Sequence, residues 1–196
     1  MVEKNGLGFI GKQVFENLSA LSSKDPQNPI METAEKMHQK INMDLVTGCY
    51  NRNFWEEFTT IKKKENTSII MCDVDGLKKI NDEKGHLVGD NLIKSVASYL
   101  KKEFNQENNI VIRYGGDEFI IICTNIKDKD SFLTETIEKF NSEKLKGFNV
   151  SFGIAHFDSS ETSLKDTFNR ADDLMYRNKK EGYIQSVADA YLPVSV

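Results

Sequence analysis

The sequence contains few residues of several types, and their scarcity excludes some classes of protein. Its 196 residues include only three prolines, one tryptophan and three cysteines. An odd number of cysteines with no C-x-x-C spacing argues against a disulfide framework and favours buried, reduced thiols over zinc ligands. A formal net charge of -4 gives no broad excess of Lys and Arg, so we do not expect a nucleic-acid partner.

The chain also lacks a long apolar run. Nowhere does it approach the ~18 apolar residues of a membrane span, and residues 1–15 have no unbroken apolar stretch behind a basic start. We therefore expect a cytoplasmic chain with no membrane partner. Its 39% hydrophobic and 29% charged residues suit one globular domain plus an appendage.

The first 43 residues have a pattern of their own. Apolar residues between positions 10 and 21 recur at helical spacing and are followed by a Ser-, Asp- and Pro-rich break at residues 22–29. Ala34, Met37 and Ile41 then form a narrow apolar stripe, which suits a helix that packs on one partner. We predict that residues 1–43 form a helical signalling or dimerisation segment.

From residue 44 onward, short strands and helices alternate. Asn51 is suited to cap a helix that buries Phe54 and Phe58, and Ser163 and Asp166 have capping-box spacing before the last helix. β-rich apolar runs predict strands at residues 67–72, 110–114, 119–123 and 148–155. Apolar stripes predict further helices over residues 92–104, 132–140 and 164–174.

The Gly115-Gly116 step lies between the second and third predicted strands. Glycine readily adopts positive φ, so we expect a tight hairpin turn there and antiparallel pairing of the two strands. The order of elements then predicts an α+β fold in which a mostly antiparallel central sheet is flanked by helices.

Two acidic clusters stand where folding alone explains acids poorly. Asp73 and Asp75 end an apolar strand, and Asp117 and Glu118 lie at the predicted hairpin. Either cluster taken alone could be a solvated turn. Together, each beside a buried strand, they indicate a shared divalent cation, because a hard cation relieves the repulsion between converging carboxylates. Magnesium with a phosphate ligand is the natural hypothesis.

Five ordered motifs resemble those of one known family. The run Arg113-Tyr114-Gly115-Gly116-Asp117-Glu118-Phe119 resembles the signature that names the GGDEF family of diguanylate cyclases. The other four motifs are Asp44-Leu45-Val46-Thr47-Gly48 with Asn51-Arg52, residues 73–82 with Gly85-His86 and Gly89-Asp90, Ser151-Phe152-Gly153-Ile154-Ala155, and Ala171-Asp172 with Leu174, Tyr176 and Lys179. They cover residues 44–183, which we expect to form a palm-like domain with a ferredoxin-like core, followed by a C-terminal extension at 184–196.

The resemblance implies a metal centre. Asp73 and Asp117 would hold Mg2+, or Mn2+ in its place, with the Val74 carbonyl as a further ligand. Glu118 would be an additional metal ligand or a proton acceptor. These three acids are the predicted catalytic residues, and their placement suits a two-metal phosphoryl transfer.

The resemblance also implies a GTP site. Asn81 and Asp90 would read guanine, since an Asp carboxylate can accept from its N1–H and amine, whereas adenine leaves that acceptor unpaired. The other implied contacts are Gly76, Leu77, Lys78, Gly115, Gly116 and Lys179. An alternative for Asp90 is the N-cap of the helix at Leu92. Either lysine, taken alone, would more often be a solvated surface residue.

The implied activity is condensation of two GTP molecules into cyclic di-GMP, with release of two pyrophosphates, by a Mg2+-dependent homodimer that an upstream sensor domain could control. Two alternatives stay open: a catalytically silent domain that binds GTP, and an interaction module that works through its N-terminal helices. Two departures from the family matter. Tyr183 replaces an arginine that often contacts phosphate, and Gln106 and Asn109 replace the R-x-x-D motif that binds the cyclic product.

Overall fold

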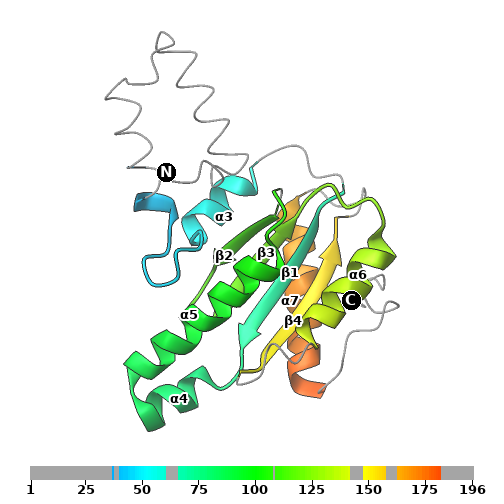
Figure 1. Cartoon of the computed structure of the whole chain (residues 1–196). Helices are drawn as coiled ribbons and strands as arrows, with labels where there is room; N and C mark the ends of the chain where they lie inside the picture. The colour runs from blue at the N-terminus through cyan, green and yellow to red at the C-terminus, as the bar shows by residue number, and fades with distance from the viewer. Residues whose placement is uncertain are drawn as a thin grey trace.

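A computed structural model describes residues 37, 40–60, 66–107, 109–141, 148–157 and 163–181 (Figure 1). The predictions for residues 1–36 and 182–196 fall outside the described residues, including the one that concerns Tyr183. Among the helices that are described, none combines the length and apolar character required to cross a membrane.

The described chain is built on one four-stranded sheet. Its strands are β1 (Ser68–Val74), β2 (Asn109–Arg113), β3 (Glu118–Cys123) and β4 (Val150–His156). They lie in the order β2-β3-β1-β4, and every neighbouring pair is antiparallel. The α+β fold and the antiparallel sheet are therefore confirmed.

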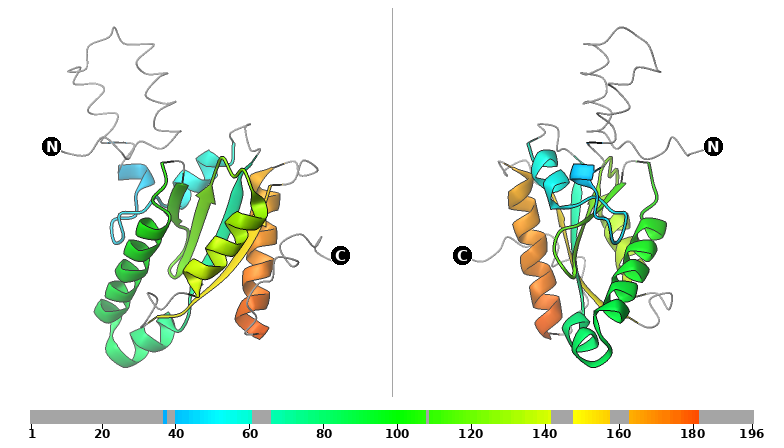
Figure 2. Two further views of the ribbon diagram at one scale, coloured as in Figure 1. Left: turned by 45° about the vertical axis from the view of Figure 1, so that its right-hand side comes forward. Right: turned by 90° about the vertical axis from the view of Figure 1, so that its left-hand side faces the viewer.

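Both faces of the sheet are covered by helices. On one face Ile70 and Cys72 of β1 pack with α5 (His86–Glu103) and α6 (Lys129–Phe140). On the other, Ile69 and Met71 pack with α3 (Arg52–Phe58) and α7 (Leu164–Glu181). Figure 2 shows α5 and α7 on opposite sides of the sheet. Because side chains alternate along a strand, Asp73 continues the set that faces α7.

Local signals fix the ends of two helices as expected. The Asn51 side chain accepts hydrogen bonds from the backbone N–H groups of Asn53 and Phe54 at the start of α3. Before α7, the carboxylate of Asp166 accepts from the backbone N–H of Ser163 (2.8 Å) and from its hydroxyl (3.1 Å). Each cap satisfies N–H groups that would otherwise lack an intrahelical partner.

The cysteines are free and buried, as their spacing predicts. Burial raises the pKa of Cys123 to about 12 and that of Cys72 well above its usual value, so both thiols stay protonated in the core. They therefore act as small apolar residues.

The segment between β1 and α5 differs from the expectation. Residues Leu77–Lys84 form an additional helix, α4, which has no fully buried residue and only two apolar ones, Leu77 and Ile80, too few to predict a helix from the sequence. Gly85, with φ 84°, then leads directly into α5, which begins at His86 rather than near Leu92. Asp90 consequently lies inside a helix, and the alternative that it is an N-cap is wrong.

The hairpin between β2 and β3 also differs. Neither Gly115 nor Gly116 has a positive φ, so the expectation that they supply the positive φ of a tight turn is wrong. The turn spans the residues between Arg113 and Glu118, and the Tyr114 N–H donates to the Glu118 carbonyl at 2.9 Å. Gly115 leaves room for the Glu118 carboxylate, which would have to shift if a Cβ were added at this position.

Candidate functional site

The acidic residues gather at one end of the sheet. Asp73 lies directly opposite Glu118 of β3 and Ser151 of β4. Residues that pair across neighbouring strands share a face, so all three project toward the α7 side. The hairpin is joined to β1 at the same point, because the Val74 N–H donates to the Asp117 carbonyl at 2.9 Å. The two acidic clusters are thus brought together.

One lysine and one serine contact these acids. Lys179, on α7, places its Nζ 2.6 Å from Asp73 Oδ1 and 4.0 Å from Asp75 Oδ1. The Ser151 hydroxyl donates to Asp75, with its Oγ 2.9 Å from Oδ1 and 3.1 Å from Oδ2. The predicted phosphate-binding lysine is therefore at the acidic end of the sheet, and in this structure it pairs with a carboxylate.

The field at this end favours a positively charged ligand. Burial, followed by the charges of Asp117, Asp172 and Asp73, raises the pKa of Glu118. Burial and the charges of Asp173 and Asp73 likewise raise the pKa of Asp172. Asp172 had no role in the sequence prediction. The only signal for it was its place in the last-helix motif, since its proximity to Glu118 depends on how α7 packs on the sheet.

The donor set suits a hard divalent cation, but it is not assembled as a finished site. Carboxylate and carbonyl oxygens are the ligands that Mg2+ prefers. Among the residues that the structure describes, however, no three His, Cys, Asp or Glu side chains already converge closely enough to hold a metal ion. Instead the Lys179 ammonium supplies a positive charge at Asp73. A cation is accepted at this position, and metal binding would require the side chains to rearrange.

The predicted guanine readers lie on α4 and α5. Asn81 is half-buried and Asp90 is exposed. Gly89 allows the two helices to approach each other, because a Cβ there would collide with the Asn81 side chain. These contacts set Asn81 close to the turn of α5 that carries Asp90. The close packing of α4 on α5 could not be predicted from the chain, since α4 itself was missed.

The remaining predicted contacts lie at the start of α4. Gly76, with φ 76°, occupies the N-cap position of this helix, where its left-handed conformation excludes most other residues. Leu77 packs partly against the core, whereas Lys78 is exposed. Lys78 thus has the accessibility that a ligand contact needs, which is also that of an ordinary surface lysine.

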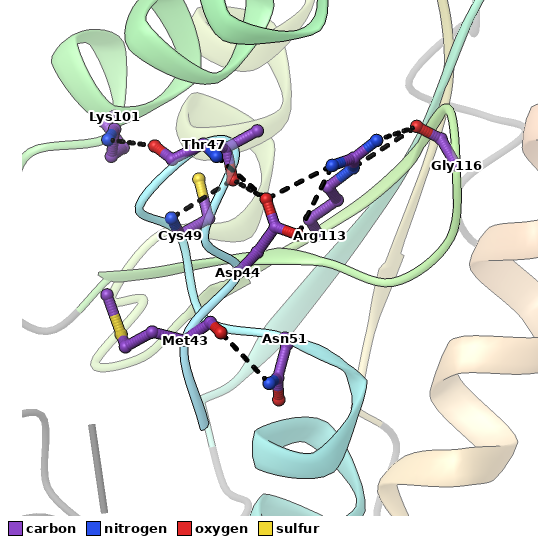
Figure 3. Close-up of polar contacts among 8 residues, drawn as sticks. All are labelled: Met43, Asp44, Thr47, Cys49, Asn51, Lys101, Arg113 and Gly116. Atoms are coloured by element: carbon purple, nitrogen blue, oxygen red, sulfur yellow. Dashed lines mark hydrogen bonds and ion pairs between the residues drawn. The ribbon is translucent and has the colours of Figure 1, made fainter. Parts of the chain in front are cut away.

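A second polar network holds the signature hairpin from outside (Figure 3). The Arg113 guanidinium donates to both oxygens of Asp44, at 3.2 and 3.3 Å, and to the Gly116 carbonyl at 2.8 Å. Asp44 also accepts from the Thr47 N–H (2.9 Å) and hydroxyl (2.7 Å). Lys101 of α5 donates to the Thr47 carbonyl at 2.8 Å. The turn at residues 44–49 is thereby fixed between α5 and the hairpin tip.

Sequence analysis had assigned no function to Arg113. Burial would raise the pKa of Asp44, but hydrogen bonds from Thr47 and the Arg113 charge outweigh it and hold that pKa below its usual value. The Asp44 carboxylate is therefore ionised at neutral pH. Arg113 links the hairpin to Asp44, which lies far away in the sequence. No local sequence pattern indicates such a contact.

The comparisons with known proteins agree with this architecture. Residues 41–185 match the family described as diguanylate cyclase, GGDEF domain. Diguanylate cyclase DgcM of Escherichia coli (strain K12) is 31% identical over 159 residues, in a match that covers 76% of this chain and 38% of that protein. This chain thus spans less than half the length of that relative.

Solved structures give the same result. The GGDEF domain of DgcB from Caulobacter crescentus, in complex with c-di-GMP, has a TM-score of 0.63 at 25% identity, covering 74% of this chain and 93% of that chain. A DgcB structure with coiled coil and GGDEF domain has a TM-score of 0.69 at 23% identity, covering 90% and 97%, and supports the fold alone. With the family match extending over most of its length, this chain belongs to the GGDEF domain family of diguanylate cyclases.

Proposed function

We propose that this chain condenses two molecules of GTP into cyclic di-GMP and releases two molecules of pyrophosphate, as one half of a dimer of GGDEF domains. The observation that carries the proposal is the position of Asp73 opposite Glu118, at the end of the sheet where the intact Gly115-Gly116-Asp117-Glu118 hairpin meets β1. Carboxylates that repel one another at a strand end are poorly explained by stability, but they are useful for binding a metal–triphosphate.

Each residue of the site has a defined task in this reaction. Asp73, Asp117 and the Val74 carbonyl would hold Mg2+, or Mn2+ in its place, with Glu118 as a further ligand or as the acceptor of the 3'-hydroxyl proton. The metal, when bound, supplies charge stabilisation at the phosphates. Gly115 and Gly116 expose backbone against which the nucleotide can lie.

The nucleotide would be positioned by the two helices beside the hairpin. Asp90 accepts from the N1–H and the amine of guanine, and Asn81 contacts the base from α4. Gly76 and Leu77 border the phosphates, and Lys78 provides positive charge. Adenine would leave the Asp90 carboxylate without its donors, so GTP is favoured over ATP.

The bond changes require two nucleotides that face each other. The 3'-hydroxyl oxygen of one GTP attacks the α-phosphorus of the other, the bond to the β-phosphate oxygen breaks, and pyrophosphate leaves. The same step in the opposite direction closes the ring. One domain that binds one GTP can supply only half of the reactants, so the rate depends on a homodimer, whose assembly an upstream sensor domain would control.

Incubation of the chain with GTP and Mg2+, followed by mass spectrometry, tests the proposal. Cyclic di-GMP is expected, with a specific activity that rises with chain concentration, and no cyclic product is expected from ATP alone. Binding of GTP without any cyclic product would instead indicate a catalytically silent domain. If GTP did not bind either, an interaction module would be the better interpretation.

A further inference from the structure

Lys179 occupies a position that a metal ion would also need. Its Nζ lies 2.6 Å from Asp73 Oδ1, an oxygen that the proposed metal would use, and 4.0 Å from Asp75 Oδ1. The Lys179 side chain is 42% exposed, whereas that of Asp73 is 13% exposed. The lysine therefore reaches from the surface toward a carboxylate that is nearly covered.

The charges around Lys179 explain why it lies there. Partial burial works against its charge, but the hydrogen bond and charge of Asp73, followed by the charges of Asp75 and Asp117, outweigh it and raise the pKa of Lys179. The ammonium group thus serves several carboxylates. Such a group stabilises closely placed acids in the same way that a divalent cation does, although with only half the charge.

The ammonium group and a divalent cation cannot share this position. Both would contact the same carboxylate, and two positive charges a few ångströms apart repel each other. A lysine can move out of the way, because its charge is carried on a flexible four-carbon chain. Asp75 need not follow, since Ser151 holds both of its oxygens independently.

We infer that Lys179 is an exchangeable internal counter-ion: it neutralises Asp73 while no metal is bound, and it must leave Asp73 before a divalent cation can bind there. The displaced ammonium group is then free to contact the triphosphate that arrives with the cation. Metal and nucleotide consequently bind together far better than the metal binds alone. This inference rests on the proposed metal site, but its test does not depend on turnover.

The experiment measures Mn2+ binding to the nucleotide-free protein by electron paramagnetic resonance, in the wild type and in Lys179→Met. We expect Lys179→Met to bind Mn2+ about fivefold more tightly, equivalent to about 1 kcal/mol, because the competing charge is gone. Lys179→Arg keeps the charge and should bind no more tightly than the wild type. The matched control is Lys180→Met, since Lys180 is the next residue on α7 and lies over the Tyr176 ring, 4.3 Å from its centroid. Lys180→Met should leave Mn2+ affinity unchanged.

A second titration uses a GTP analogue with a methylene group between the α and β phosphorus atoms, in the presence of Mn2+. Here Lys179→Met should bind about fivefold more weakly than the wild type, because the phosphates have lost a charge partner. This reversal of sign is specific to an exchanging lysine, since a merely structural residue would lower both affinities.

Three outcomes would overturn the inference. The first is unchanged or weaker Mn2+ binding by Lys179→Met without nucleotide, and the second is an equal gain in Mn2+ affinity in Lys180→Met. The third is that Lys179→Met and the wild type both show no measurable Mn2+ binding. The cyclase assay separates these from failure of the proposed function. If the wild type makes cyclic di-GMP and the Mn2+ affinities do not differ, only the counter-ion role is wrong. If the affinities differ as expected and no product forms, only the activity is wrong.

Discussion

The two ends of the central strand β1 carry different kinds of polar group, neutral at one end and charged at the other. At its start, Ser68 lies opposite Cys123 of β3 and His156 of β4, and the Ser68 hydroxyl and His156 Nδ1 are 2.5 Å apart. At its other end, Asp73 lies opposite Glu118 and Ser151. The first end places neutral groups together in the core. The second concentrates carboxylates, with Lys179 as the cation that pairs with Asp73.

This difference separates an end whose polar groups suit a stable core from the end that we propose binds metal and nucleotide. A buried polar group costs little when its hydrogen bonds are made, so the Ser68–His156 pair is compatible with a stable core. Several carboxylates near one another cost free energy unless a cation joins them. The acidic end thus has lower stability than an apolar replacement would give, and it has a correspondingly greater affinity for cations.

The largest effect is expected from changes at the acidic end. Asp73→Ala and Asp117→Ala should each reduce cyclic di-GMP synthesis at least about a thousandfold, roughly 4 kcal/mol in activation free energy, because the metal loses a ligand beside a highly charged triphosphate. The fold should survive, since each change removes a repelling charge and the pair that Asp73→Ala loses involves the partly exposed Lys179. Product formation and thermal unfolding of the same samples would check both statements. Near-wild-type synthesis by either variant would remove the metal assignment.

A pH titration tests the neutral end. Burial, followed by the charges of Lys129 and Arg170 and opposed by Asp130, lowers the pKa of His156 to about 4. In the unfolded chain this imidazole takes up a proton near pH 6.5, so the unfolded state binds more protons below that pH. The contribution of His156 to the free energy of unfolding is therefore fully present above about pH 6.5 and is lost as the pH falls toward 4. At pH 5 this loss is about 2 kcal/mol.

Denaturant unfolding of the wild type and His156→Gln between pH 7 and pH 5 isolates this contribution. The glutamine variant should be less stable at pH 7 but should lose about 2 kcal/mol less over this interval. Carboxylates that titrate at low pH affect both proteins equally. Parallel pH dependence in the two proteins would show that His156 is not kept neutral by the fold.

A smaller effect is expected from the network that holds the hairpin. Asp44→Asn keeps the shape of the side chain but removes its charge. The Arg113 guanidinium, which donates to the Gly116 carbonyl, then lacks the carboxylate that holds it in position. We expect a stability loss of about 1 kcal/mol and a loss of synthesis of about tenfold, because the carboxylate of Asp117 is no longer held in place.

The control for this experiment is Lys165→Met, which removes an exposed ion pair to Glu56 (2.7 Å) on the surface. Such a pair contributes at most about 1 kcal/mol and often much less, and it has no link to the hairpin. Equal losses of synthesis in both variants would show that the Asp44–Arg113 pair has no special role in positioning the hairpin.

Sequence reasoning succeeded where the signal is local. The Asn51 cap, the Ser163–Asp166 pair and the four strands follow from residues within a few positions of one another. It failed at α4, because this short helix has only two apolar residues and buries neither completely. At the site, it singled out the acids that the fold brings together, but it did not predict the pairing of Lys179 with Asp73, which depends on how α7 packs on the sheet.

The smallest effect expected is product inhibition, and its near absence follows from the neutral end of the sheet. Asn109 begins β2 opposite Cys123, in the same row as Ser68 and His156. Its side-chain amide donates to the Gln106 side chain, so these two positions satisfy each other with neutral groups. An arginine and an aspartate at these positions, as in R-x-x-D, would offer a bidentate donor to phosphate or guanine and an acceptor for guanine.

Calorimetric titration should therefore detect no tight binding of cyclic di-GMP to the nucleotide-free protein, and added product should change turnover less than about twofold. The double variant Gln106→Arg with Asn109→Asp should gain both binding and inhibition, because it restores the charged pair without touching the acidic end. Tight cyclic di-GMP binding that is retained in Asp73→Ala, together with product inhibition of the wild type, would contradict this prediction. It would show that the neutral end holds a product site.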